Sequence, residues 1–183
     1  MNVERSHLEG VVQLTPRVFT DDRGWFKETY QAPRYRELGI PELPQHNVSL
    51  SKKGVVRGLH FQREPHAQGK LIQVLRGAVW DVVVDLREGS PTYGQWASFD
   101  LSAENHRQLW VPAGFAHGFQ ALEDDTVFHY ACSALYNPAA EGAIHVFSPA
   151  LALPWPLREA ALVNAKDLAT REFERRGGEE SGD

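Results

Sequence analysis

The chain has 183 residues, of which 42% are hydrophobic and 23% charged, with 15 glycines and 11 prolines. This composition and length predict one globular domain over residues 1–183 with many turns. The net charge of −5 excludes a nucleic-acid binder that works by broad phosphate neutralisation, and no stretch is apolar enough to predict a membrane span.

The start of the chain, MNVERSHLEGVVQL, has no apolar core of signal-peptide length, so we expect a cytoplasmic protein with neither membrane nor nucleic acid as a partner. The one cysteine, Cys132, excludes an intramolecular disulfide and any metal site built from several cysteines. We expect it to be a small buried apolar residue.

In chain order, residues 33–38 predict a short helix, and a series of short apolar runs separated by turn signals follows. A spacing of about 8–12 residues between such runs is typical of a β-sandwich or barrel. One or two further helices are expected within 157–175, broken near Asn164, and the charged, glycine-rich stretch 171–183 is expected to end as a frayed tail. The predicted strands are 45–51, 55–62, 70–76, 78–86, 95–101, 107–111, 118–122 and 126–133.

The run VWDVVVDL shows the strand alternation most clearly, because every second residue lies on one face. One face carries Trp80 and further apolar residues, whereas the other mixes valines with Asp81 and Asp85. A buried carboxylate needs a partner or a shifted pKa. We leave open whether Asp81 is buried, and we expect Asp85 to face solvent.

Polar side chains gather at strand ends and next to small residues, which let a ligand approach the backbone closely. His60, in VVRGLHFQ, can accept and return a proton at neutral pH. Lys70 can stabilise an oxyanion, and PAGFAHGF brings His117 to a turn between strands. Tyr130 is either a proton donor or a core aromatic, and the pattern alone favours the core aromatic.

Two further interpretations concern the same region. Arg57 and His60 have opposite parity on their strand, so both can reach one ligand only if a bulge lies between them, for which Gly58 is the obvious place.

A metal site formed by His60, His66 and His117 is the alternative to a proton-transfer site. The six-residue spacing of the first two is unlike the usual arrangement of histidines one residue apart, so we favour proton transfer.

The candidate site residues lie in longer sequence motifs that resemble those of a known family. The chain resembles the dTDP-4-dehydrorhamnose 3,5-epimerases from about residue 11 to about residue 167. The resemblance implies an all-β jelly-roll (cupin-like) β-sandwich with short peripheral helices, mainly C-terminal, and a homodimer. It rests on DDRGWFKE, QHNVSLSKKGVVRGLHFQ, QGKLIQVLRGAVWDVVVDLREGSPTYGQW, LSAENHRQLWVPAGFAHGF, ALYNPAAEG and NAKDL.

The resemblance also implies roles. His60 looks like the base that removes a proton next to the C4 keto group, with Asp167 orienting it. Lys70 looks like the stabiliser of the enolate oxygen, and Tyr130 like the acid that returns a proton to the opposite face. The expected substrate contacts are Gln45, Asn47, Arg57, His117, Tyr136 (stacked on thymine), Glu141 and Lys166, with Asp81 as an inward-facing acid and Arg23 and Glu28 lent to the neighbouring subunit.

The implied reaction inverts C3 and C5 of dTDP-4-dehydro-6-deoxy-D-glucose to give dTDP-4-dehydro-L-rhamnose, without a cofactor. Phe147 and Ser148 depart from the Asn-Asp or Asp-Asp pair common in the family, which keeps open an epimerase of antibiotic deoxysugar pathways that inverts only one centre. Three more classes of protein stay open: a ketoisomerase, a metal-dependent cupin oxygenase and a non-catalytic sugar-binding jelly roll.

Overall fold

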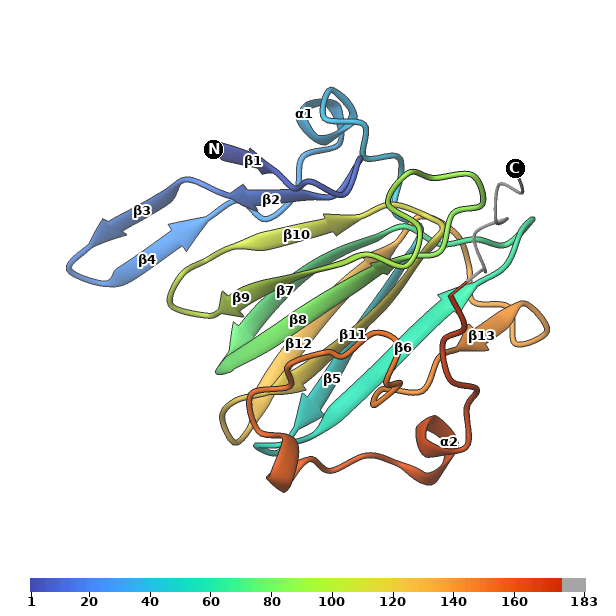
Figure 1. Ribbon diagram of the computed structural model, residues 1–183. Helices are drawn as coiled ribbons and strands as arrows, with labels where there is room; N and C mark the ends of the chain where they lie inside the picture. The colour runs from blue at the N-terminus through green and yellow to red at the C-terminus, as the bar shows by residue number, and fades with distance from the viewer. Residues whose placement is uncertain (176–183) are drawn as a thin grey trace.

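The structure is a computed structural model that describes residues 1–175, and these form two β-sheets packed face to face, as predicted for a jelly roll (Figure 1). The six-stranded sheet contains, in spatial order, β1 (Asn2–Arg5), β2 (Val12–Thr15), β10 (Gln108–Val111), β7 (Lys70–Arg76), β12 (Thr126–Cys132) and β5 (Gln45–Ser51). The five-stranded sheet contains β13 (Glu141–Ala143), β6 (Val56–Gln62), β11 (Phe115–Ala121), β8 (Ala78–Asp85) and β9 (Trp96–Ser102).

A separate hairpin of β3 (Val18–Asp21) and β4 (Gly24–Lys27) projects from one end of the sandwich (Figure 1). The helical pieces are short: α1 (Ala32–Arg36), the 3-10 turn η1 (Arg158–Ala160) and α2 (Ala165–Leu168). They confirm the expected helix near residue 33 and the expected break at Asn164. Within residues 1–175, no helix is long and apolar enough to cross a membrane.

Apolar side chains fill three layers, one between the sheets and one outside each sheet. The inner layer includes Ile72, Val83 and Phe128. The segment that runs from β13 to the C-terminal side covers the outer face of the five-stranded sheet with side chains such as Trp155, and the region around α1 covers part of the other sheet. Each sheet is therefore buried on both faces over much of its area, which holds its strands rigidly.

Strand β8 is buried on both sides, and its alternation is as predicted. Val79 and Val83 face the inner layer, whereas Trp80 and its neighbours of the same parity face the outer one. Asp81 is wholly buried, which answers the question that the strand pattern left open. The expectation that Asp85 faces solvent is wrong, because this side chain is also 0% exposed.

Asp85 is buried because the turn that follows it supplies donors to both carboxylate oxygens. Arg87 donates to it from its backbone amide and from its guanidinium, and the hydroxyls of Ser90 and Thr92 donate at 2.6 Å. Burial by itself raises the pKa of this carboxyl, but the hydrogen bonds outweigh it and hold the pKa of Asp85 well below its usual range.

The bulge predicted in β6 is present. His117 of β11 pairs with His60 and Phe119 pairs with Arg57, so β6 contains one residue more than β11 over the same span. Gly58 is required there, since its φ is +143° and an added Cβ would lie 2.6 Å from the Cα of Gly118. Arg57 and His60 can therefore both face the space between the sheets.

Three expectations need correction. His117 lies within β11 and not in a turn, because the strand begins at Phe115, three residues earlier than predicted. The short strands β1 to β4 and β13 were not predicted. The chain around Phe173 is packed, since this side chain is 6% exposed, so the expected frayed tail does not begin at residue 171. The rest of the expected tail, residues 176–183, lies outside the residues that the structure describes.

We expect Asp85→Asn to lower the free energy of unfolding by about 2 kcal/mol at pH 7. The Asn side chain has an NH2 group, a hydrogen-bond donor, in place of one carboxylate oxygen, so donors of the turn would lose their acceptor. A carboxyl with a depressed pKa in the folded state stabilises above its unfolded pKa, and this stabilisation is lost as pH falls through the folded value. Urea unfolding at pH 7 and at lower pH should show the gap between variant and wild type shrinking in acid. The exposed Asp100→Asn serves as control, and a gap that persisted unchanged in acid would contradict the assignment.

Candidate active site

A pocket of about 190 Å³ lies between the two sheets and brings together the residues singled out from the sequence. A second space of about 100 Å³ shares His60, Lys70 and Tyr130 with it, so the two are compartments of one cleft. The inner compartment is lined by Ser49, Arg57, His60, Lys70, His117, Phe119, Phe128, Tyr130, Asn164 and Asp167.

His60 is paired with a buried carboxylate. Its Nε2 lies 2.7 Å from Oδ1 of Asp167, and the carboxylate is almost wholly buried whereas the imidazole is 36% exposed toward the cleft. An ionised carboxylate only accepts hydrogen bonds, so Nε2 carries the hydrogen and Nδ1 keeps the lone pair that a base needs. The pair therefore has the geometry of a histidine oriented for proton abstraction.

Helix α2 delivers Asp167 to this position. Asn164 caps the helix, its side chain accepting from the Asp167 amide at 2.7 Å, and the carbonyl of Asp167 accepts from the Thr170 hydroxyl. These local bonds fix the backbone on both sides of the carboxylate, so its direction toward His60 is set before any ligand binds.

Lys70 and Tyr130 approach the cleft from the opposite sheet. Lys70 begins β7 and its Nζ lies 6.0 Å from the centre of the Tyr130 ring, which stands on β12. Burial lowers the pKa of the Lys70 ammonium and raises the pKa of the Tyr130 phenol. The phenol thus holds its proton at neutral pH, and the interpretation of Tyr130 as only a core aromatic is replaced by one in which it lines the cleft.

His117 lies deeper in the same compartment and has a carboxylate of its own. Its Nε2 is 2.8 Å from Oδ2 of Asp81, and both side chains are buried. Asp81 does not line either compartment, so it reaches the cleft only through His117. Asp81 is thus an inward-facing acid, as the resemblance implied, and it lies behind the imidazole.

Hydrogen bonds to β5 hold the Arg57 side chain at the wall of the cleft. Its Nε donates to the Ser51 hydroxyl and its Nη2 to the carbonyl of Leu50, both on β5. The guanidinium is therefore tied to the six-stranded sheet although its backbone belongs to the other sheet, which fixes a positive charge beside the cleft.

The outer compartment is polar and is lined by Gln45, Asn47, Tyr136 and Glu141, and Lys166 is joined to it through Glu141. Gln45 donates to Asn47 and accepts from the backbone amide of Tyr136, whose hydroxyl donates to Glu141 at 3.2 Å. Lys166 donates to the same carboxylate at 2.7 Å, and this hydrogen bond is the main reason that the pKa of Glu141 is lowered. The Tyr136 ring is half exposed at the mouth, where it can stack on a planar group.

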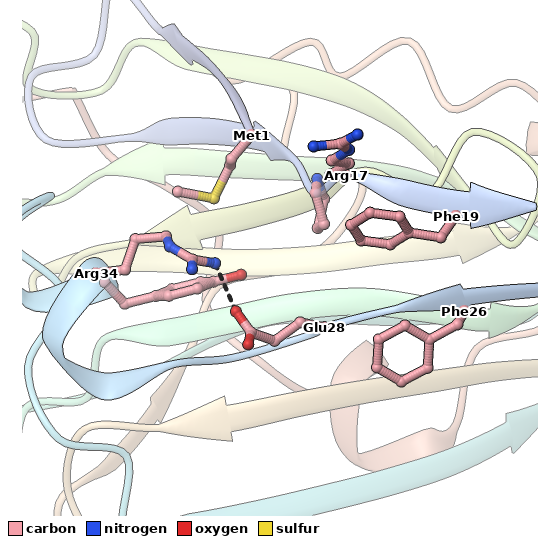
Figure 2. A pocket seen from close by; sticks show the side chains of 8 residues that line it. Met1, Arg17, Phe19, Phe26, Glu28 and Arg34 are labelled. Atoms are coloured by element: carbon pink, nitrogen blue, oxygen red, sulfur yellow. Dashed lines mark hydrogen bonds and ion pairs between the residues drawn. The ribbon is translucent and has the colours of Figure 1, made fainter.

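Arg23 and Glu28 are not brought to this cleft within the chain. Arg23 stands at the tip of the β3–β4 hairpin and pairs with Asp21. Glu28 pairs with Arg34 in a separate pocket of about 400 Å³ at the base of the hairpin, beside Phe19 (Figure 2).

Some residues of the site were missed from the sequence. Phe119 and Phe128 stack with ring centres 4.0 Å apart and form an apolar wall, and Ser49 adds a hydroxyl. The strand parity of the two phenylalanines, shared with His117 on β11 and with Tyr130 on β12, was the signal that could have found them. His66 does not line the cleft, and within residues 1–175 no three His, Cys, Asp or Glu side chains lie close enough together to hold a metal ion.

The chain is similar to known proteins of one enzyme family. The sequence model of the dTDP-4-dehydrorhamnose 3,5-epimerase family matches residues 5–175. A relative of that name from Neisseria gonorrhoeae is 48% identical over 170 residues, which are 92% of this chain but 52% of the relative, so the chain spans about half of that protein.

Solved structures match over nearly their full length. A dTDP-6-deoxy-D-glucose-3,5-epimerase from Legionella pneumophila, in complex with dTDP-4-keto-L-rhamnose, is 46% identical with a TM-score of 0.90, covering 93% of this chain and 92% of that one. A 3'-monoepimerase from Streptomyces bikiniensis, in complex with dTDP-quinovose, is 33% identical with a TM-score of 0.87, covering 91% and 85%. The chain therefore belongs to the dTDP-4-dehydrorhamnose 3,5-epimerase family of isomerases.

Proposed function

We propose that this protein inverts C3 and C5 of dTDP-4-dehydro-6-deoxy-D-glucose and so forms dTDP-4-dehydro-L-rhamnose. The observation that carries the proposal is that His60 stands on one sheet and Tyr130 on the other, with one cleft between them. A sugar ring lying in that cleft would meet a proton acceptor on one face and a proton donor on the other. That is what inversion of a carbon centre requires.

In the proposed reaction, His60 removes the proton from a carbon next to the C4 keto group, and the electron pair moves onto the keto oxygen as an enolate. Lys70 stabilises that oxygen with its positive charge. Tyr130 then gives its proton to the same carbon from the opposite face as the enolate collapses to the ketone. C3 and C5 both adjoin C4, so one set of groups can serve both.

This chemistry needs no redox cofactor and no metal, since the keto group accepts the electron pair. Asp167 supports the cycle by holding the imidazole and by balancing its charge once the proton has been taken up. Each inversion leaves one proton more on His60 and one fewer on Tyr130, so a proton must return to Tyr130 before the next turnover.

For the nucleotide we propose the outer compartment. The exposed ring of Tyr136 suits stacking on thymine, and Gln45, Asn47 and Glu141 supply polar contacts around it, with Lys166 paired to Glu141. Arg57 offers a fixed positive charge at the wall of the inner compartment, suited to the diphosphate or the sugar.

A second candidate is inversion at a single carbon. Its support is the likeness to the 3'-monoepimerase of Streptomyces bikiniensis, which shares the fold at 33% identity. The same proton-transfer groups would serve either reaction, so the number of carbons labelled from solvent separates them.

Incubation with dTDP-4-dehydro-6-deoxy-D-glucose in deuterated water should place deuterium at both C3 and C5, because the hydrogen returned to each carbon comes from the Tyr130 hydroxyl, which exchanges with solvent between turnovers. Proton NMR of the product should show both signals lost. Label at one carbon alone would contradict the double epimerisation and favour the second candidate.

We further propose that the enzyme works in the cytoplasm as a homodimer that shares Arg23 and Glu28 between subunits. Three aromatic residues on the projecting hairpin, Phe19, Trp25 and Phe26, are each at least half exposed, and aromatic surface of this extent is typical of an interface. A dimer would bury it and carry Arg23 toward a neighbouring cleft.

A subunit-mixing experiment tests the shared site. Arg23→Ala and His60→Asn should each have little activity alone, whereas co-expression should restore about a quarter of the wild-type activity, since half of the random dimers contain one complete site. The matched control co-expresses His60→Asn with Asp167→Asn, which damage the same chain's site and should not complement. Absence of recovery with the first pair would contradict sharing of Arg23.

A further inference from the structure

Strand β8 carries two buried carboxylates that differ in how many hydrogen bonds they accept. Asp81 and Asp85 have the same parity and both are 0% exposed. Asp85 accepts hydrogen bonds on both oxygens from three side chains and a backbone amide. Asp81 accepts one, from His117, and its Oδ1 has no protein donor within residues 1–175.

An incompletely satisfied buried carboxylate lowers the stability of a fold. Burial accordingly raises the pKa of Asp81, against the opposing effects of His117 and of the charge on Lys70. A neutral side chain of similar size would be less costly at this position. The charge therefore calls for a reason other than stability, and such groups gather at functional sites.

His117, the one hydrogen-bond partner of the Asp81 side chain within residues 1–175, stands on the wall of the cleft. His117 lies directly across the ladder from His60 and in the inner compartment, away from the polar outer compartment that contains Tyr136 and Glu141. Because Asp81 accepts from Nε2, the other ring nitrogen, Nδ1, is the one left for a ligand. The imidazole also stacks on Phe128, which limits its rotation.

We infer that Asp81 is a positioning residue that acts through His117: it sets which ring nitrogen faces the sugar and makes that nitrogen a stronger hydrogen-bonding group. The inference rests on the proposed function, because it assigns His117 to the sugar end of the cleft. It separates the two buried aspartates of β8 into one that serves the site and one that serves the fold.

The test compares Asp81→Asn with Asp85→Asn, two substitutions of the same kind on the same strand. Four quantities are measured for each: the melting temperature, the affinity and the stoichiometry of dTDP binding by calorimetry, and kcat with the keto-sugar substrate. dTDP lacks the sugar, so it reports the outer compartment and the fraction of folded sites independently of His117.

For Asp81→Asn we expect an undiminished melting temperature, unchanged dTDP binding and a kcat lower by about tenfold or more, which is the effect of losing one charge-assisted hydrogen bond. Asp85→Asn should show the reverse, with a lower melting temperature and unchanged kcat per dTDP-binding site. The double variant Asp81→Asn/His117→Asn should be no slower than His117→Asn alone, since residues that act as one unit are not additive.

Unchanged kcat in Asp81→Asn would overturn the inference, and so would a fall in dTDP affinity as large as the fall in kcat. Multiplying effects in the double variant would also overturn it, because Asp81 would then act independently of His117. Wild-type protein that binds dTDP but leaves the keto sugar unchanged would overturn the proposed function and this inference with it. Normal wild-type turnover beside an unimpaired Asp81→Asn would overturn the inference alone.

Discussion

The 2.7 Å contact between His60 and Asp167 joins two parts of the chain that lie 107 positions apart, and the rest of the site depends on it. The contact forms because the chain after β13 returns along the outer face of the five-stranded sheet, where side chains such as Trp155 and Phe173 pack in a buried layer. Apolar burial thus brings the C-terminal segment into place, and the cap at Asn164 then turns the carboxylate toward the imidazole. Hydrophobic packing supplies the stability, and the polar contact supplies the direction.

A second constraint is the bulge at Gly58. A regular strand would send Arg57 and His60 to opposite faces, one into the cleft and one into the outer apolar layer. The extra residue in β6 turns both toward the cleft, and the close approach of Gly118 leaves no room for a side chain at position 58. The sandwich then places Lys70 and Tyr130 on the facing sheet, so the two proton-transfer groups stand on opposite sides of a bound ring.

Much of the fold could be predicted because the central strands alternate cleanly and end at glycine or proline signals. Segments 45–51 and 70–76 agree with β5 and β7 to the residue. The early strands were missed because they are short and several of their residues are exposed, so no apolar alternation marks them. Burial of Asp85 was missed although its donors follow within seven residues, since a strand pattern says nothing about hydrogen bonds from the next turn.

The site itself could be predicted only in part from residue spacing. The bulge followed from parity, but the pairing of Asp167 with His60 came from family resemblance, because no local pattern reports a contact over such a separation. The position of Asp81 behind His117 required the structure, as parity shows which face a side chain takes and not which neighbour it meets.

In the proposed mechanism, His60 takes the proton on one face of the sugar and Tyr130 returns one on the other. The most direct measurement follows solvent deuterium in substrate and product with His60→Asn and Tyr130→Phe. We expect His60→Asn to abolish both exchange and inversion, whereas Tyr130→Phe should lose most inversion yet still exchange the proton of recovered substrate. Exchange that survived in His60→Asn, or inversion at the wild-type rate in Tyr130→Phe, would contradict it.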